Sequence, residues 1–127
     1  MNREQLFLLI AAVGLTPIAL AYGLLSASTM PMLYGVDADN VSSIHIFRAV
    51  MGLYLAMVVF WLLGARRDSL TIPALYSVVV FMLGLAAGRA ASLLVDGMPS
   101  VLLVVYLVLE VGFGATGIFL LRNLKRQ

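Results

Sequence analysis

Long apolar runs separated by short polar breaks dominate the pattern of the chain. Four such runs cover residues 6–25, 46–65, 70–95 and 101–121. Each has about 20 residues or more, the length that an α-helix needs to cross about 30 Å of hydrocarbon. Strands are disfavoured because the strict alternation of a transmembrane β-strand is missing from these runs. The pattern therefore predicts an all-α, four-helix transmembrane bundle.

The breaks contain residues that end and begin helices. Gly97 can take a positive φ after the third span, and Pro99 prevents that helix from continuing. Ser100 can cap the fourth span, as Ser42 or Ser43 can cap the second. The first connection is different because it is long and apolar. We expect residues 26–43 to form an outer loop that lies on the membrane surface or folds over the mouth of a single-domain bundle, residues 1–127.

Composition supports a membrane protein and removes several kinds of site. Apolar residues make up 63% of the chain, charged residues 11%, and the mean hydropathy is +1.08. A soluble domain of this length cannot hide so much apolar surface. With 0 Cys and 1 His, a disulfide framework, a thiolate metal site and a histidine cluster are excluded. We expect no metal and no cofactor.

The basic residues predict the orientation of the four spans. Six of the eight Lys and Arg residues fall on one side of the membrane, namely Arg3, Arg66, Arg67, Arg122, Lys125 and Arg126. The opposite loops contain Asp37, Asp39 and Asp96 and no basic residue. The positive-inside rule therefore predicts that both termini are cytoplasmic. Because these basic residues flank spans, nucleic-acid binding is not expected.

A second interpretation of the first run is a signal peptide. Arg3, the apolar run, Pro17 and the small residues around Ala21 resemble a cleavable leader. Cleavage after Ala21 would leave three spans. Glu4 weakens the positive N-terminal region, so we favour retention.

Three ionisable residues are predicted at membrane depth, where a charge costs about 2.5–3.5 kcal/mol on insertion scales. Glu110 lies ten residues after Ser100, about 15 Å down and near the midplane. Arg89 lies seven residues before Asp96, about 10 Å down from the same side. Arg48 is about 6 Å below the start of the second span.

The helical repeat places these residues on three polar stripes. One stripe contains His45, Arg48 and Gly52, the next Arg89, Ser92 and Asp96, and the last Tyr106, Glu110, Phe113 and Gly117. We expect the stripes to converge on a cavity that opens outward. By depth, Arg89 should pair with Glu110, and Arg48 with Asp96.

Each of these residues also has a purely structural interpretation. Arg48 and Arg89 can extend to the outer head groups, and Asp96 can serve as a turn residue. His45 fits an interfacial position. Glu110 is hardest to explain in this way, because a carboxylate cannot reach the interface from the membrane centre. It would have to be a structural ion pair or a protonated acid.

Small residues predict where helices touch. Gly84 and Gly88 form a G-x-x-x-G motif for close approach, and Gly52 is a second candidate for helix packing. The fourth span offers further small residues, namely Gly112, Gly114 and Gly117. These surfaces can serve packing within the chain or a homodimer. Trp61, near the cytoplasmic end of the second span, fits an aromatic belt or a packing role.

Several strings resemble an uncharacterised family of small bacterial four-span membrane proteins. They are Phe47-Arg48-Ala49-Val50-Met51-Gly52-Leu53-Tyr54, Gly88-Arg89-Ala90-Ala91-Ser92, Asp96-Gly97-Met98-Pro99-Ser100, and Tyr106 with Glu110. The resemblance covers about residues 46–121. It implies a multi-pass protein of the bacterial inner membrane and brings no established activity.

Three functions stay open. The first is a binding or accessory protein that holds an amphipathic molecule, such as a lipid or quinone-like compound, or docks on a larger membrane complex. The second is a small proton-coupled transporter using Glu110, with an anionic substrate because two arginines repel cations. The third is a lipid-modifying enzyme using His45, Glu110 or Asp96 as acid and base. Membrane lipids are expected partners in each case.

Overall fold

The computed structural model describes residues 1–126, in which five helices and no strand are present. The helices are α1 (Arg3–Gly23), α2 (Ser26–Tyr34), α3 (Val41–Arg66), α4 (Asp68–Val95) and α5 (Val101–Arg126). All except α2 are long and apolar enough to cross a membrane. The prediction of an all-α fold with four membrane-spanning helices is therefore confirmed.

The helices begin and end at residues that sequence rules explain only in part. Asn2 caps α1 by accepting a hydrogen bond from the Gln5 amide at 2.8 Å. Asn40, and not a serine, caps α3, so this helix begins five residues earlier than predicted. Gly97 has a φ of +95°, as predicted for the turn after α4. Ser100 precedes α5, but its buried hydroxyl has no hydrogen-bond partner among the described residues.

The connection at residues 26–43 was predicted to be a loop, yet it contains the nine-residue helix α2. This helix ends at Gly35, whose left-handed conformation (φ 69°) favours glycine. It packs against α1, α3 and α5 at one end of the molecule. Its last residue, Tyr34, is only 4% exposed. The connection therefore contains a helix that packs on one end of the long helices.

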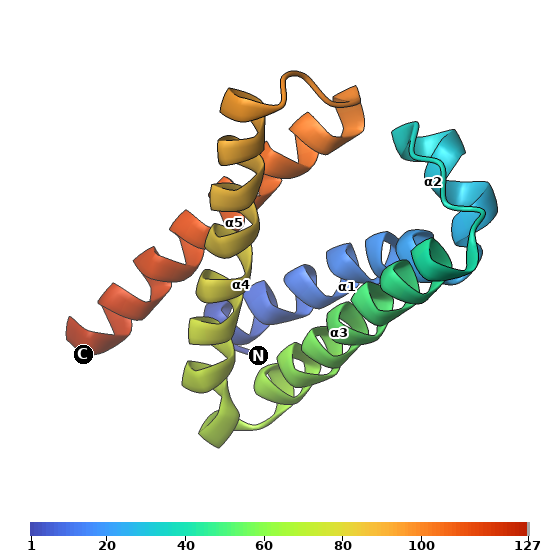
Figure 1. Ribbon diagram of the computed structural model, residues 1–127. Coiled ribbons are helices and arrows are strands. Elements are labelled where there is room, and N and C mark those ends of the chain that lie inside the picture. The colour runs from blue at the N-terminus through green and yellow to red at the C-terminus, as the bar shows by residue number, and fades with distance from the viewer. Residues whose placement is uncertain (127) are drawn as a thin grey trace.

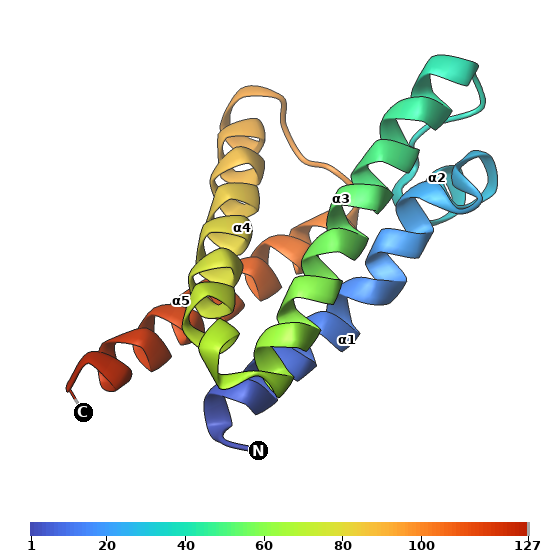
Figure 2. The same ribbon diagram turned by 90° about the horizontal axis from the view of Figure 1, so that it is seen from below.

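The four long helices form two antiparallel pairs. Helices α1 and α3 lie side by side along most of their length, while α5 crosses α4 at a larger angle (Figure 1 and Figure 2). Helix α4 joins the pairs by also packing against α3. Helices α1 and α5 have little backbone contact, and Phe7 meets Phe113 across them with ring centroids 5.6 Å apart.

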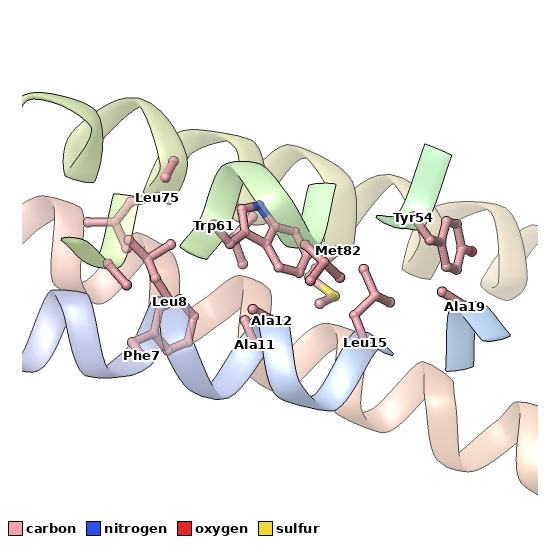
Figure 3. Packing of buried hydrophobic residues seen from close by; sticks show 14 of the residues in the cluster. Phe7, Leu8, Ala11, Ala12, Leu15, Ala19, Tyr54, Trp61, Leu75 and Met82 are labelled. Carbon is pink, nitrogen blue, oxygen red and sulfur yellow. The ribbon is translucent and has the colours of Figure 1, made fainter. Parts of the chain in front are cut away.

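Trp61 of α3 lies in the buried core with Leu8, Ala12 and Met82 (Figure 3). The Trp61 side chain is fully buried, and its indole N–H donates to the Ser77 hydroxyl at 2.9 Å. Of the two roles predicted for Trp61, packing is therefore confirmed and the aromatic belt is wrong. The indole satisfies its donor inside the protein and does not need the membrane interface.

Small residues allow the close contacts, but not those that the sequence motif predicted. A Cβ atom added at Gly64 would lie 2.5 Å from the Ala74 Cβ, so α3 and α4 approach closely there. At Gly84, Gly88 and Gly52 an added Cβ would meet nothing within 4 Å. Their predicted role in helix packing is wrong for contacts within this chain, since all three lie on exposed faces.

Candidate functional site

The ion pair predicted between Arg89 and Glu110 is confirmed. Arg89 Nε donates to Glu110 Oε1 at 2.9 Å and to Oε2 at 3.2 Å. Glu110 is 6% exposed, and the Arg89 side chain is 21% exposed. Pairing of this kind neutralises two charges that would each be costly in hydrocarbon.

The pair forms because the α4–α5 turn sets how far Arg89 and Glu110 lie along their helices, and the buried face of α5 directs Glu110 toward α4. Arg89 lies six residues before the end of α4 and Glu110 nine residues after the start of α5, so both follow from the one short turn between the helices. Glu110 shares a buried stripe of α5 with Gly114 and Gly117. Leu83 and Val79 of α4 approach these two glycines so closely that an added Cβ would lie 2.5 and 2.7 Å from them, respectively. These two of the three glycines suggested for α5 thus bring the helices together.

Four tyrosines, each from a different helix, surround the ion pair. Arg89 Nη2 lies 3.5 Å from the Tyr22 hydroxyl, and its guanidinium carbon lies 5.8 Å from the centre of the Tyr106 ring. Tyr22 stacks on Tyr34 and meets the edge of Tyr54, with centroid distances of 5.4 and 5.6 Å. The α1, α2, α3 and α5 helices therefore all contribute a ring to this end of the bundle.

Tyr34 connects the short helix to the site. Its hydroxyl lies 2.9 Å from the Tyr106 hydroxyl, within hydrogen-bonding distance. Burial, and then this hydrogen bond, raise the pKa of Tyr34 above its ordinary value. The phenol is therefore neutral at physiological pH, and α2 is tied to α5 by an uncharged link. We call α2 with the Tyr34–Tyr106 contact the tyrosine cover.

A pocket of about 80 Å³ lies beside the ion pair, between α1 and α5. Its walls come from α1, α3, α4 and α5 and are mostly apolar. Among the described residues, its charged lining side chains are Arg89 and Glu110. Two exposed residues also line it, Gly14 of α1 and Leu109 of α5. The pocket therefore opens sideways between these two helices, toward the region that lipid would occupy.

Tyr54 is a polar group of the pocket that has no partner. The residue is 6% exposed and lines the pocket. Its hydroxyl makes no hydrogen bond to any residue that the structure describes, although its ring packs against Tyr22 and Phe81. The hydroxyl is not fully enclosed, and the residue lies in the pocket wall. It can donate to, or accept from, a molecule in the pocket.

The predicted pairing of Arg48 with Asp96 is wrong. Arg48 Nε donates to the Gly23 carbonyl at 3.2 Å, and Asp96 Oδ2 accepts from the Ser92 hydroxyl at 2.7 Å. Arg48, Ser92 and Asp96 are all exposed. Ser92 lies near the pair only by lining a second hollow with Arg89, between the ends of α4 and α5.

The expected stripe of α3 also points away from the site. His45, Arg48 and Gly52 are exposed, and the first two border a surface hollow instead of the pocket. The buried stripe of α3 contains Tyr54 and Trp61. At about 100° per residue, His45 lies on the opposite side of the helix from Tyr54. Convergence of all three polar stripes is therefore wrong, and α3 contributes an aromatic face.

Sequence reasoning included Tyr106 but missed Tyr22, Tyr34 and Tyr54 as site residues. One signal was available for two of them: Tyr22, like Tyr106, lies in the outer part of its predicted span, and Tyr34 lies in the connection, whereas Tyr54 lies near the middle of its span. Over residues 1–126, no group of three or more His, Asp or Glu side chains is placed to hold a metal ion. The chemistry that the site offers is hydrogen bonding around a neutralised ion pair.

The fold and site define a class of four-span helical protein with a buried Arg–Glu pair beneath an aromatic cover. The chain belongs to the family described as Domain of unknown function (DUF4345), which matches residues 4–121. This agrees with the expected uncharacterised family and extends the match over the first helix. No curated protein matches the chain. No solved structure matches it either.

Proposed function

We propose that this chain is a small multi-pass protein of the bacterial inner membrane that binds an amphipathic molecule beside Arg89 and Glu110. One observation carries the proposal: a neutralised ion pair lines an otherwise apolar pocket that opens sideways between α1 and α5. Ligand sites typically combine apolar walls with a few placed polar groups. Membrane lipids are the partners in immediate reach.

Energetics support a working role for the pair. A buried ion pair contributes little net stability, because apolar residues of similar volume commonly replace it without loss. Arg89 and Glu110 also form part of the lining of an open pocket instead of being packed away from it. The polar groups are thus placed where a bound molecule could meet them.

The distribution of charge supports the proposed orientation, with both termini in the cytoplasm. Gln5 donates to Asp68 at 2.8 Å, and the Arg3 guanidinium lies 5.8 Å from the Phe119 ring centre. The start of α1, the α3–α4 connection and the later part of α5 therefore meet at one end. This end contains most of the basic residues, so the tyrosine cover would face outward.

The proposed binding is tested by measuring which lipids the protein retains. Wild-type protein and a Gly14→Leu variant would be purified into lipid nanodiscs, and organic extracts compared by mass spectrometry. Leucine at this open position projects into the pocket mouth, so retention of a specific amphipathic compound should fall at least about fivefold. Gly84→Leu is the matched control, because Gly84 is also helical and open but lies outside the pocket. Equal retention in all three proteins would contradict the proposal.

Proton-coupled transport through Glu110 is the second candidate. The observation that favours it is that Arg89 lines both the pocket and the second hollow. A molecule or proton passing between the two spaces would meet the ion pair. Glu110→Gln would then abolish proton-coupled uptake of an anionic substrate into liposomes, whereas a binding protein shows no flux in either form. Asp96→Asn is the control, since this carboxylate is exposed and bonded to Ser92.

A further inference from the structure

We infer that the pocket selects an amphipathic molecule whose head group is uncharged and carries a hydroxyl or carbonyl oxygen. The inference rests on the proposed binding function and names the class of molecule bound. Charge, free hydrogen-bonding groups and pocket size each support it.

The charge of the pocket is already balanced. Its formal charges are those of Arg89 and Glu110, which are bonded to each other through Arg89 Nε. An anionic head group would meet the Glu110 carboxylate, and a cationic one would meet the Arg89 guanidinium. Either would bring a net charge into a mostly apolar pocket and would be repelled by one member of the pair, a cost that its attraction to the other member has to offset. A neutral head group leaves the pair intact.

Free hydrogen-bonding groups remain beside the pair. Arginine has five N–H donors, and Arg89 uses Nε toward Glu110 and directs Nη2 toward Tyr22 at the long distance of 3.5 Å. Its Nη1 has no hydrogen-bond partner within residues 1–126. The Tyr54 hydroxyl is likewise without one. A carbonyl oxygen can accept from both groups, and a hydroxyl can also donate to Tyr54.

The size of the pocket indicates how such a molecule would lie. A cavity of about 150 Å³ holds one benzene molecule, whereas this pocket has about 80 Å³. It can accommodate a head group and the first few carbon atoms. The remaining chain must leave through the opening between Gly14 and Leu109. The tyrosine cover lies across the end of the bundle at Tyr106, so the exit is sideways.

The test uses three photoactivatable alkyl probes of equal chain length, namely an alcohol, a phosphate monoester and a quaternary ammonium. Each would be added to wild-type protein in nanodiscs at neutral pH, and the labelled peptides quantified by mass spectrometry. The alcohol should label the pocket-lining parts of α1 and α5 at least about fivefold more than either charged probe. Tyr54→Phe should lower that labelling about three- to tenfold, the effect of one hydrogen bond. Tyr76→Phe, an exposed tyrosine outside the pocket, is the control and should not change it.

The possible failures are distinguishable. If a charged probe labels the pocket as strongly as the alcohol, the inferred head group is wrong while the binding function stands. If Tyr54→Phe folds normally yet leaves the labelling unchanged, the inferred hydrogen bond between the Tyr54 hydroxyl and the head group is wrong. If no probe labels these peptides above the level in Gly14→Leu, the proposed binding function itself fails.

Discussion

The two halves of this bundle differ in what fills the space between the helices. Around Trp61, small residues let helices approach closely, and the side chains of Leu8, Leu75 and Val78 are fully buried. Toward α2, four tyrosine rings and an ion pair fill the space, and α1 and α5 leave a pocket between them. We call these the tight half and the aromatic half.

This contrast indicates which part of a membrane bundle can expose polar groups to a bound molecule. Between spans, van der Waals packing takes the place of the hydrophobic effect, so small residues in close contact give the stable part. Toward α2, α1 and α3 also meet closely at Gly23, where an added Cβ would collide with Met51, and the opening lies between α1 and α5. The tight half therefore fixes the relative positions of the helices, and the aromatic half can expose polar groups to a bound molecule.

The strongest way to break this division is to remove one member of the ion pair. Glu110→Gln leaves the Arg89 charge buried without its partner, and arginine cannot lose its proton. The free energy of unfolding should fall by about 3–5 kcal/mol. Arg89→Gln should cost less, because a proton can neutralise the remaining carboxylate. Unfolding by denaturing detergent in mixed micelles measures both values.

The control for these variants is Asp96→Asn, which alters an exposed carboxylate and should change stability by less than about 0.5 kcal/mol. A double variant that replaces Arg89 and Glu110 with leucine should recover much of the loss, since no charge is then buried. If Glu110→Gln were as harmless as Asp96→Asn, the pair would not hold α4 and α5 together.

A smaller effect is expected from overpacking the tight half. Gly64→Val would push a side chain against Ala74 and the Leu70 carbonyl, so α3 and α4 must separate. The expected loss is about 1–3 kcal/mol, measured by the same unfolding assay. Gly52→Val is the control on the same helix, because nothing lies within 4 Å of its added Cβ. Similar losses in both variants would mean that close approach at Gly64 is not a source of stability.

The sequence predicted the relative positions of residues along the helices well and the direction of their side chains poorly. The Arg89–Glu110 pair could be predicted because both residues are counted from one short turn, at 1.5 Å per helical residue. Arg48 and His45 were placed on the wrong side of α3, because every face of a membrane span is apolar and no hydrophobic stripe marks the inward one. The inward face was therefore predicted from the positions of polar residues, and on α3 the polar face is the exposed one.

The small-residue motif failed for a related reason. Gly84 and Gly88 have the spacing for close approach, but spacing does not say which neighbour a face meets, and theirs meets open space. The helix α2 was missed because a nine-residue segment containing Pro31 and several Ser and Thr residues has weak intrinsic helix propensity. Contact with α1, α3 and α5 stabilises it, and a sequence alone does not contain that contact.

The smallest change in stability is expected from a substitution in the tyrosine cover. Tyr34→Phe keeps the ring stacked on Tyr22 but removes the hydroxyl bonded to Tyr106. The loss should be about 0.5–1.5 kcal/mol and local, so amide hydrogen exchange should increase in α2 and stay unchanged around Trp61. Tyr76→Phe is the control, because Tyr76 lies on α4, outside the helices that α2 contacts, and it should leave exchange in α2 unchanged. Faster exchange throughout the protein would show that the cover and the tight half unfold together.

The same link makes a prediction about pH. Burial raises the folded-state pKa of Tyr34 above the value of about 10 that a free tyrosine has. A group with a raised pKa contributes its stability fully below the unfolded value and loses it only as the pH rises through the folded one. After correction for the intrinsic pH dependence of exchange, protection of α2 should therefore be constant from pH 6 to about pH 9. A decrease within that range would mean that a different group, and not the Tyr34 phenol, controls the cover.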